Sequence, residues 1–156
     1  MTGTEIPVSL DDKPRLSAMF ADYLAEMSRF LPGADPHAPY PWFDHYWQEA
    51  ESRLPFWLVC DNSEAGFALV RREAETGDMD MAEFYVAPAF RRRGAGHAAA
   101  RRLIARFPGT WRISQLAGNA PAIAFWHRVL DGFVRYDETT TRNGGIARLE
   151  QRFSYP

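Results

Sequence analysis

The sequence predicts an α+β, or mixed α/β, fold in a single domain that spans residues 1–156, and three observations support this prediction. The chain has 156 residues, enough for one domain whose core needs neither disulfides nor metal. Hydrophobic residues make up 46% and charged residues 24%, which is typical of globular proteins and not of disordered chains. The hydrophobic period is helical before Pro55, and after it strand-like and helical segments alternate.

The first third of the chain is expected to contain one strand and two helices. Residues 6–10 (IPVSL) have the composition of a short strand. From 11 to 30, apolar side chains recur at three- and four-residue spacing, which predicts a helix. Four prolines within 31–41 end this pattern, and residues 42–53 are expected to form a second, aromatic-rich helix.

The rest of the chain is expected to form strands and two further helices. Alternating apolar residues between turn signals predict strands at 56–60, 65–73, 79–88, 111–117, 134–141 and 146–155. Apolar spacing and the flanking Asn, Pro and Gly residues predict helices at 94–107 and 120–130. The predicted order of elements is therefore β-α-α-β-β-β-α-β-α-β-β.

Several kinds of protein are excluded by the sequence. The single cysteine, Cys60, rules out an internal disulfide and a multi-cysteine zinc site, and His37 and His45 have no metal-ligand spacing, so no metal is expected. No apolar run approaches the ~20 residues of a membrane span. Residues 1–12 carry acids where a signal peptide carries bases, so we expect a cytoplasmic protein with no membrane partner.

Positive charge is concentrated in one third of the chain. Residues 84–130 contain eight arginines and no acidic residue, whereas the remainder carries ten basic and twenty acidic residues. This distribution predicts an anionic partner for the segment or, alternatively, a solvated arginine-rich helix face. A nucleic acid is not the expected partner, because the chain has one lysine, Lys13, and an acidic remainder.

The motif at residues 86–96 predicts a phosphate-binding loop. A strand ending in V-A-P precedes three arginines (91–93), and a Gly-x-Gly (94–96) then opens a helix. Glycines let backbone N–H groups approach a ligand that a Cβ would block. The helix N-terminus adds unpaired donors and partial positive charge, and arginines add charge-assisted hydrogen bonds.

A dinucleotide is one phosphate-containing ligand that such a loop could bind. Gly94, Gly96 and Ala99 can be compared with the G-x-G-x-x-G/A fingerprint of dinucleotide-binding folds. However, the glycines do not directly follow the strand, and no acidic residue occurs before Asp131 to bind a ribose. NAD is therefore disfavoured.

A comparison of the same loop with a second family fits better than the comparison with dinucleotide-binding folds. Arg91-x-x-Gly94-x-Gly96 resembles the R/Q-x-x-G-x-G/A signature of the GNAT superfamily of N-acetyltransferases, and it follows V-x-P as in that family. The family's N-x-x-A-x-x-F-Y…G-F segment is resembled by Asn119, Ala122, Phe125, Trp126, Gly132 and Phe133. The order of elements is also similar over nearly the whole chain. The resemblance implies a central, mostly antiparallel twisted sheet flanked by helices, with acetyl-CoA as co-substrate.

The resemblance also assigns residues to the cofactor. The pyrophosphate of CoA is expected on backbone amides of the phosphate-binding loop, and the pantetheine arm is expected to pair with strand 79–88 where it splays from strand 111–117. Asn119 is expected to bond this arm, to cap the following helix, or both. The expected cofactor-binding residues are Tyr85, Val86, Arg91, Arg92, Arg93, Gly94, Ala95, Gly96, Asn119 and Phe125.

Glu83 is the predicted general base. An amine of pKa about 10.4 loses its proton at pH 7 at a cost of about 4.6 kcal/mol, and a carboxylate can accept that proton directly or through a water. Glu83 is the only acid in the apolar stretch that leads to the loop, and Tyr85 is a second candidate on the same face. The alternative for Glu83 is an ion pair with Arg71 or Arg72.

The general acid is left unassigned. Many family members have a tyrosine that protonates the departing thiolate, and Trp126 stands at that position. An indole N–H is not a useful acid, so the thiolate is expected to take its proton from water.

The predicted function is acetyl-CoA-dependent transfer of an acetyl group to a primary amine of a small molecule or peptide, directly in a ternary complex. A covalent route through Cys60 is not expected, because no histidine is paired with it. Aromatic residues between the first two helices are expected to wall the acceptor site. The alternative is a non-catalytic acyl-CoA-binding or regulatory module, and the last strands offer an edge for a homodimer.

Overall fold

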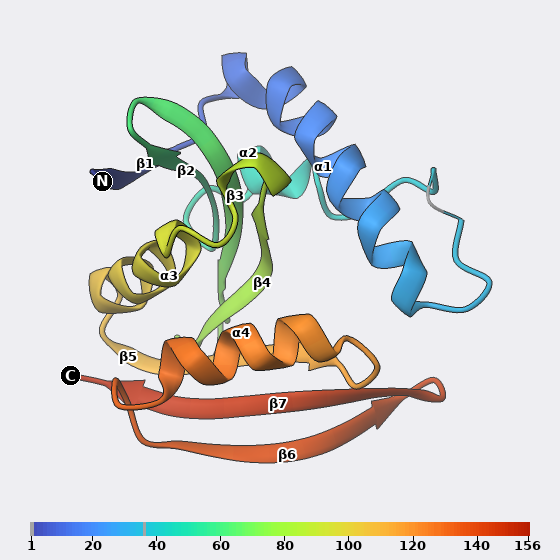
Figure 1. The fold of residues 1–156 in the computed structure, drawn as a ribbon, viewed down its shortest axis with the longest axis vertical. Coiled ribbons are helices and arrows are strands. Elements are labelled where there is room, and N and C mark those ends of the chain that lie inside the picture. The colour runs from blue at the N-terminus through green and yellow to red at the C-terminus, as the bar shows by residue number, and fades with distance from the viewer. Residues whose placement is uncertain (1, 36) are drawn as a thin grey trace.

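The computed structural model describes residues 2–35 and 37–156, and it contains a seven-stranded sheet with helices on both faces (Figure 1). The strand order is β1-β2-β3-β4-β5-β7-β6, and only the β4–β5 pair is parallel. The strands are β1 Gly3–Pro7, β2 Arg53–Cys60, β3 Ser63–Arg72, β4 Met79–Val86, β5 Gly109–Leu116, β6 Tyr136–Asn143 and β7 Ile146–Tyr155. The helices are α1 Lys13–Met27, α2 His45–Gln48, α3 Ala95–Arg106 and α4 Ala120–Leu130, with 3-10 turns at Leu10–Asp12, Ser28–Phe30 and Pro88–Phe90. The predicted fold class, element order and mostly antiparallel sheet are confirmed.

Two predicted elements have different bounds in the structure. The second helix, expected over 42–53, is the single turn α2, because Arg53 already pairs with Arg71 at the start of β2. The first strand lies at Gly3–Pro7 rather than 6–10, since pairing with β2 ends where the Ser9 side chain begins to cap a 3-10 turn. Sheet pairing therefore overrode the local pattern in both cases. Within the proline-rich break, Pro36 lies outside the described residues.

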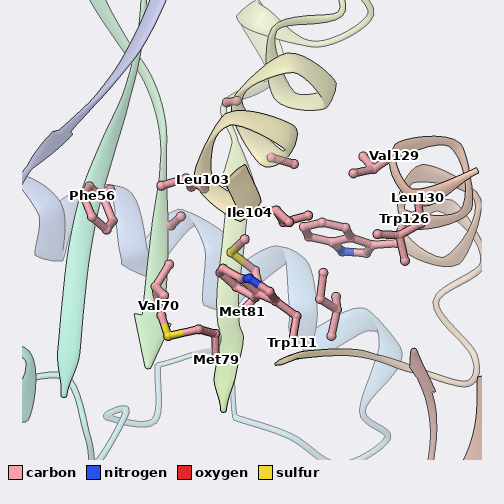
Figure 2. Packing of buried hydrophobic residues seen from close by; sticks show 14 of the residues in the cluster. Phe56, Val70, Met79, Met81, Leu103, Ile104, Trp111, Trp126, Val129 and Leu130 are labelled. Carbon is pink, nitrogen blue, oxygen red and sulfur yellow. The ribbon is translucent and has the colours of Figure 1, made fainter. Parts of the chain in front are cut away.

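The two faces of the sheet carry different cores. On one face, α3 and α4 pack an aliphatic and tryptophan-rich cluster that includes Leu103, Ile104, Trp111 and Val129 (Figure 2). On the other face, α1 and α2 pack a cluster made mostly of aromatic residues, including Phe20, Tyr23, Tyr46, Phe67 and Tyr85. Figure 1 shows α1 and α3 on opposite sides of the central strands. A substrate approaching from the α1 side therefore meets aromatic rings and hydroxyl groups.

Strands β4 and β5 diverge, as the family resemblance implies. They pair only at Met79–Trp111 and Asp80–Arg112, so the rest of each strand faces an unpaired gap between them. A β-bulge at Ala82 adds one residue to β4 opposite β3, because Leu69 pairs with Glu83 while Val70 pairs with Met81. The extra residue reverses the alternation of side chains, so that Met81 and Phe84 pack on the α3–α4 side and Tyr85 packs on the α1 side. The bulge thus also turns Glu83 toward α1.

Candidate active site

The loop between β4 and α3 forms an open set of backbone donors. Arg92 has φ +64° and Gly94 has φ +76°, so left-handed residues alternate along the loop, and Gly94 is the N-cap of α3. Among the described residues, none accepts a hydrogen bond from the backbone N–H groups of 92–97. Such turns gather N–H groups into a concave nest that suits an anion, and the N-terminus of α3 adds partial positive charge.

Gly96 brings α3 close to its neighbours. A Cβ at this position would lie 2.8 Å from Val86 Cγ2 and 3.5 Å from Phe125 Cε2. The first turn of α3 therefore packs directly on β4 and α4, and only glycine fits without displacement. A substitution at Gly96 tests packing as well as anion binding, whereas Gly94 is required for its backbone angle.

The three arginines of the loop have different partners. Both Nη atoms of Arg91 donate to the carboxylate of Glu26 on α1, each at 2.8 Å, and its Nε donates to the Val86 carbonyl at 2.7 Å. The Arg91 guanidinium also lies over the ring of Tyr85, 5.4 Å from its centroid. Arg92 and Arg93 are exposed, and no described side chain pairs with either. The free cations next to the nest are therefore Arg92 and Arg93, and Arg91 links the loop to α1.

Most other arginines of the basic segment also have structural partners. The guanidinium of Arg102 binds the buried carboxylate of Glu5, and that of Arg101 donates to the Val129 and Asp131 carbonyls at the end of α4. Arg106 donates to the Glu5 carbonyl, and Arg112 pairs with Asp80. Of the eight arginines in 84–130, three therefore pair with acids from other parts of the chain, and Arg101 and Arg106 bind backbone carbonyls.

Asn119 and Phe125 lie at the gap between β4 and β5. Asn119 Oδ1 accepts from the Ala122 N–H at 3.2 Å, so the predicted helix cap is confirmed, and its Nδ2 faces Met27 Sδ at 3.8 Å. Phe125 stacks on Phe84 of β4 at 5.5 Å between ring centroids. Their proposed contacts with the cofactor remain predictions.

Trp126 belongs to the core. It is 5% exposed, and its ring packs edge-on against Phe84 and Phe125. Figure 2 shows the indole pointing from α4 toward Ile104 inside the cluster. The residue that replaces the family's tyrosine therefore fills space between α4 and the sheet, and it supplies no acid.

Glu83 is half-buried on the α1 side of β4 and is bound by a tyrosine. The Tyr23 hydroxyl of α1 donates to Glu83 Oε2. Loss of solvation raises the pKa of Glu83 to about 7, against the lowering effect of the hydroxyls of Tyr23 and Tyr40 and the charge of Arg148. A carboxyl group with this pKa can both accept and release a proton near neutrality.

The alternative of an ion pair for Glu83 is wrong. Arg71 Nη2 pairs with Asp80 Oδ2 at 3.0 Å, and no described cation lies within ion-pair distance of Glu83. The bulge at Ala82 explains this outcome, because it changes which β4 side chain lies beside Arg71: Asp80 is the residue opposite it in register.

Three tyrosines that the sequence did not single out as catalytic surround Glu83. Burial raises the pKa of Tyr23 and of Tyr40 well above the usual value, and that of Tyr46 to about 12, so all three hydroxyls stay protonated and can donate. The Tyr46 hydroxyl is buried without a partner among the described residues. These residues come from α1, the following loop and α2, so only tertiary packing brings them to β4.

Tyr85 shares the face of Glu83, as expected, but its surroundings do not favour a base. It is 7% exposed and packs against Tyr23 and Phe67. Burial raises its pKa above the usual value, ahead of the opposing effect of the Arg91 charge. Glu83 is thus the better proton acceptor of the two candidates.

The expected aromatic wall divides into two groups. Phe43 and Trp47 pack on the core, and the Trp47 Nε1 donates to the Val8 carbonyl. Tyr40 contacts Trp42, whose side chain is 50% exposed. His45 pairs with Glu49 at the surface. The segment therefore contributes Tyr40 and Tyr46 to the surroundings of Glu83, and the exposed Trp42 lies next to Tyr40.

The described residues contain neither a group of three metal-ligating side chains nor a helix long and apolar enough to cross a bilayer.

Comparison with known proteins agrees with the motifs. The family model described as the acetyltransferase (GNAT) family matches residues 17–131. The ribosomal-protein-S18-alanine N-acetyltransferase of Escherichia coli is similar with 20% identity and a TM-score of 0.65, over 99% of this chain and 94% of its own. An acetyltransferase of Thermus thermophilus has 20% identity and a TM-score of 0.68, over 97% and 96%.

A third solved structure is the spermidine N-acetyltransferase of Vibrio cholerae in complex with CoA and spermine. It has 10% identity and a TM-score of 0.69, over 98% of this chain and 95% of its own. Identities this low show a shared fold. No curated protein matches this chain in sequence.

Proposed function

Because this chain belongs to the acetyltransferase (GNAT) family, we propose that it moves the acetyl group of acetyl-CoA directly to a primary amine in a ternary complex. The proposal rests on how three features are arranged along β4. The end of this strand leads into the nest of free N–H groups, and one edge of the strand borders the gap to β5. On the α1 side of the strand, Glu83 has a pKa of about 7.

The nest and the two free arginines fit the diphosphate of CoA. The backbone donors of 92–97 suit phosphate oxygens, and Arg92 and Arg93 add two cations that have no ion-pair partner among the described residues. The unpaired edge of β4 near Tyr85 and Val86 suits an extended arm, although the Val86 carbonyl already accepts from Arg91. Acetyl-CoA supplies the activated acetyl group, and CoA is the leaving group, released as a thiolate when the C–S bond breaks.

Glu83 is the proposed general base. With a pKa of about 7 it is half ionised at neutral pH, so it can take a proton from the ammonium form of the acceptor. The neutral amine forms the new C–N bond while the thioester C–S bond breaks, and one proton is released overall because the CoA thiol stays largely protonated below its pKa of about 8.5. The Tyr46 hydroxyl, which has no hydrogen-bond partner in the part of the chain that the structure describes, can hold the amine or a water near Glu83. The general acid stays unassigned, since Trp126 is a core residue.

Calorimetric titration with acetyl-CoA, with CoA and NAD as comparators, tests the cofactor. We expect micromolar binding of acetyl-CoA and none of NAD. Absence of acetyl-CoA binding would overturn the proposal. A screen of amines that follows CoA release then tests transfer, and tight binding without transfer to any amine would favour the acyl-CoA-binding module instead.

We also propose that residues 1–156 act as one acetyltransferase domain, since β1 and β7 belong to the same sheet. A homodimer stays a proposal that rests on β6, whose outer edge ends the sheet. Light scattering across concentrations tests it, and a monomer at every concentration would remove it.

A further inference from the structure

Arg148 is an exposed cation on the face of the sheet that carries Glu83. Along β7, Gln151 and Phe153 are buried on the α3–α4 side, where Gln151 bonds Gln115 and Phe153 joins the core cluster. Side chains alternate between faces of a strand, so Arg148 points to the opposite face, the one covered by α1. Among the described residues, no acidic side chain pairs with Arg148.

The other cations of this face already have acidic partners. Asp80 lies between Arg71 and Arg112, at 3.0 and 3.3 Å, and Arg152 pairs with Asp78 at 2.7 Å.

A fourth cation of this side, Arg53, lies 3.5 Å from Glu49. Among the described residues of this sheet face, Glu83, Asp137, Arg148 and Glu150 have no ion-pair partner, and Glu150 lies between Arg148 and Arg152 on its strand. Arg148 is thus a cation on the face of Glu83 that is available to a ligand.

Arg148 lies opposite Leu116 at the end of β5, across the β4–β5 gap from Glu83. Its charge lowers the pKa of Glu83 and also that of Tyr23, whereas the charge of Asp80 raises the pKa of Glu83. A ligand whose amine meets Glu83 therefore lies in the field of the Arg148 guanidinium. A second ammonium group would be repelled there, and a carboxylate would be attracted.

We propose, building on the proposed function, that the acceptor is a small amine that also carries a carboxylate, and that Arg148 binds this carboxylate while the amine lies at Glu83. The buried Tyr46 hydroxyl, which has no hydrogen-bond partner among the described residues, is a further polar group that the amine end can use. The site is then matched to a molecule with opposite charges at its two ends.

Matched pairs of acceptors test this specificity. Initial rates are measured for alanine against ethylamine and for 4-aminobutanoate against propylamine, which differ only in the carboxylate, and for spermidine and an alanine-starting peptide amide. We expect kcat/KM to be at least about tenfold higher for one carboxylate-bearing member than for its partner. Arg148→Gln should bring that ratio close to one, because the accompanying rise in the pKa of Glu83 slows both members of a pair alike, and Arg148→Lys should restore part of the ratio.

Arg142→Gln is the control, because Arg142 lies on the same hairpin and its guanidinium donates to the Gly145 carbonyl within its own turn. It should leave the ratio unchanged. A ratio near one in the unaltered protein, a ratio that survives in Arg148→Gln, or a preference for spermidine or the peptide would overturn the inference. Failure of the proposed function is distinct, since it appears as no transfer to any amine or no acetyl-CoA binding.

Discussion

The two sides of β4 that we propose for the cofactor and the acceptor use different parts of the chain. The proposed cofactor side is a contiguous loop whose donors are backbone N–H groups, shaped by left-handed Arg92 and Gly94. The proposed acceptor side is one carboxylate, Glu83, whose properties depend on hydroxyl groups that lie 60 and 43 positions earlier, at Tyr23 and Tyr40. A loop of this kind can be recognised from neighbouring residues, whereas a tuned carboxylate becomes visible only after folding.

The two sides are joined by one turn of α1. Tyr23 donates to Glu83, and Glu26, one turn further on, binds both Nη atoms of Arg91 in the loop. Met27 then faces Asn119 at the start of α4. The relative position of the two sides is therefore set by α1 as well as by the strand they share.

The largest difference between the two sides is expected from Glu83→Gln. Removing the base should lower kcat by about 10²–10⁴-fold, while the Kd of acetyl-CoA should change by less than about twofold because the loop donors are untouched. Steady-state kinetics and calorimetry on the same protein separate these effects. Asp137→Asn, an exposed carboxylate on β6, is the control and should retain activity. Equal activity in both variants would remove Glu83 from the mechanism.

Loss of a free cation from the loop should produce the opposite pattern. Arg92→Gly removes the charge and accommodates φ +64° without strain, so we expect the Kd of acetyl-CoA to rise about 5–10-fold, with kcat at saturation nearly unchanged. Arg135→Gln, which removes an exposed arginine after α4, serves as the control in the same titration. An unchanged Kd in Arg92→Gly, or an equal rise in Arg135→Gln, would argue against a specific anion site.

Tyr23→Phe should shift the pH dependence of catalysis. The Tyr23 hydroxyl lowers the pKa of Glu83, so its removal should raise that pKa and move the acidic limb of the kcat profile to higher pH, by about half a unit or more. Activity should fall near pH 6–7 and recover at higher pH. Tyr136→Phe, whose hydroxyl bonds Asp131 far from this face, should leave the limb in place. A limb that stays or moves to lower pH in Tyr23→Phe would contradict the role of this hydrogen bond.

The smallest effect concerns stability. The pKa of Glu83 is about 7 in the folded protein, against an ordinary value of 4.5. The neutral carboxyl therefore adds to the free energy of unfolding below about pH 4.5, and this contribution is lost as the pH rises through about 7, where the half-buried carboxyl ionises. Glu83→Gln avoids this charge and should be more stable than the parent by about 1–2 kcal/mol at pH 8, with little difference at pH 5. Thermal unfolding at the two pH values measures this. A variant that is less stable at pH 8 would indicate that ionised Glu83 is stabilised by its neighbours.

Local signals predicted some elements closely. Helix α4 begins and ends where Asn119, Pro121 and the apolar spacing place it, and β7 has the predicted bounds. The second helix is shorter than predicted, because Arg53 already belongs to β2, where it pairs with β3. Aromatic periodicity alone does not reveal that competing partner.

The arginine-rich segment is a similar case. Charge counting indicates an anionic partner, but Arg91 and Arg102 bind Glu26 and Glu5, which lie in the first fifth of the chain. Arg92 and Arg93 remain free beside the nest. Which arginines are available for a ligand depends on contacts over more than sixty positions, which composition does not contain.

The sequence by itself determined the order of elements, the loop of unpaired N–H groups and the position of Glu83 in β4, because turn angles, helix starts and strand alternation depend on neighbouring residues. The tertiary structure decided the orientation and the pKa of Glu83. The bulge at Ala82 turns it toward α1, burial raises its pKa, and Tyr23 and Tyr40 limit that rise. Solvation and hydrogen bonding act through space, so the chemistry of a carboxylate is set by the segments that fold around it.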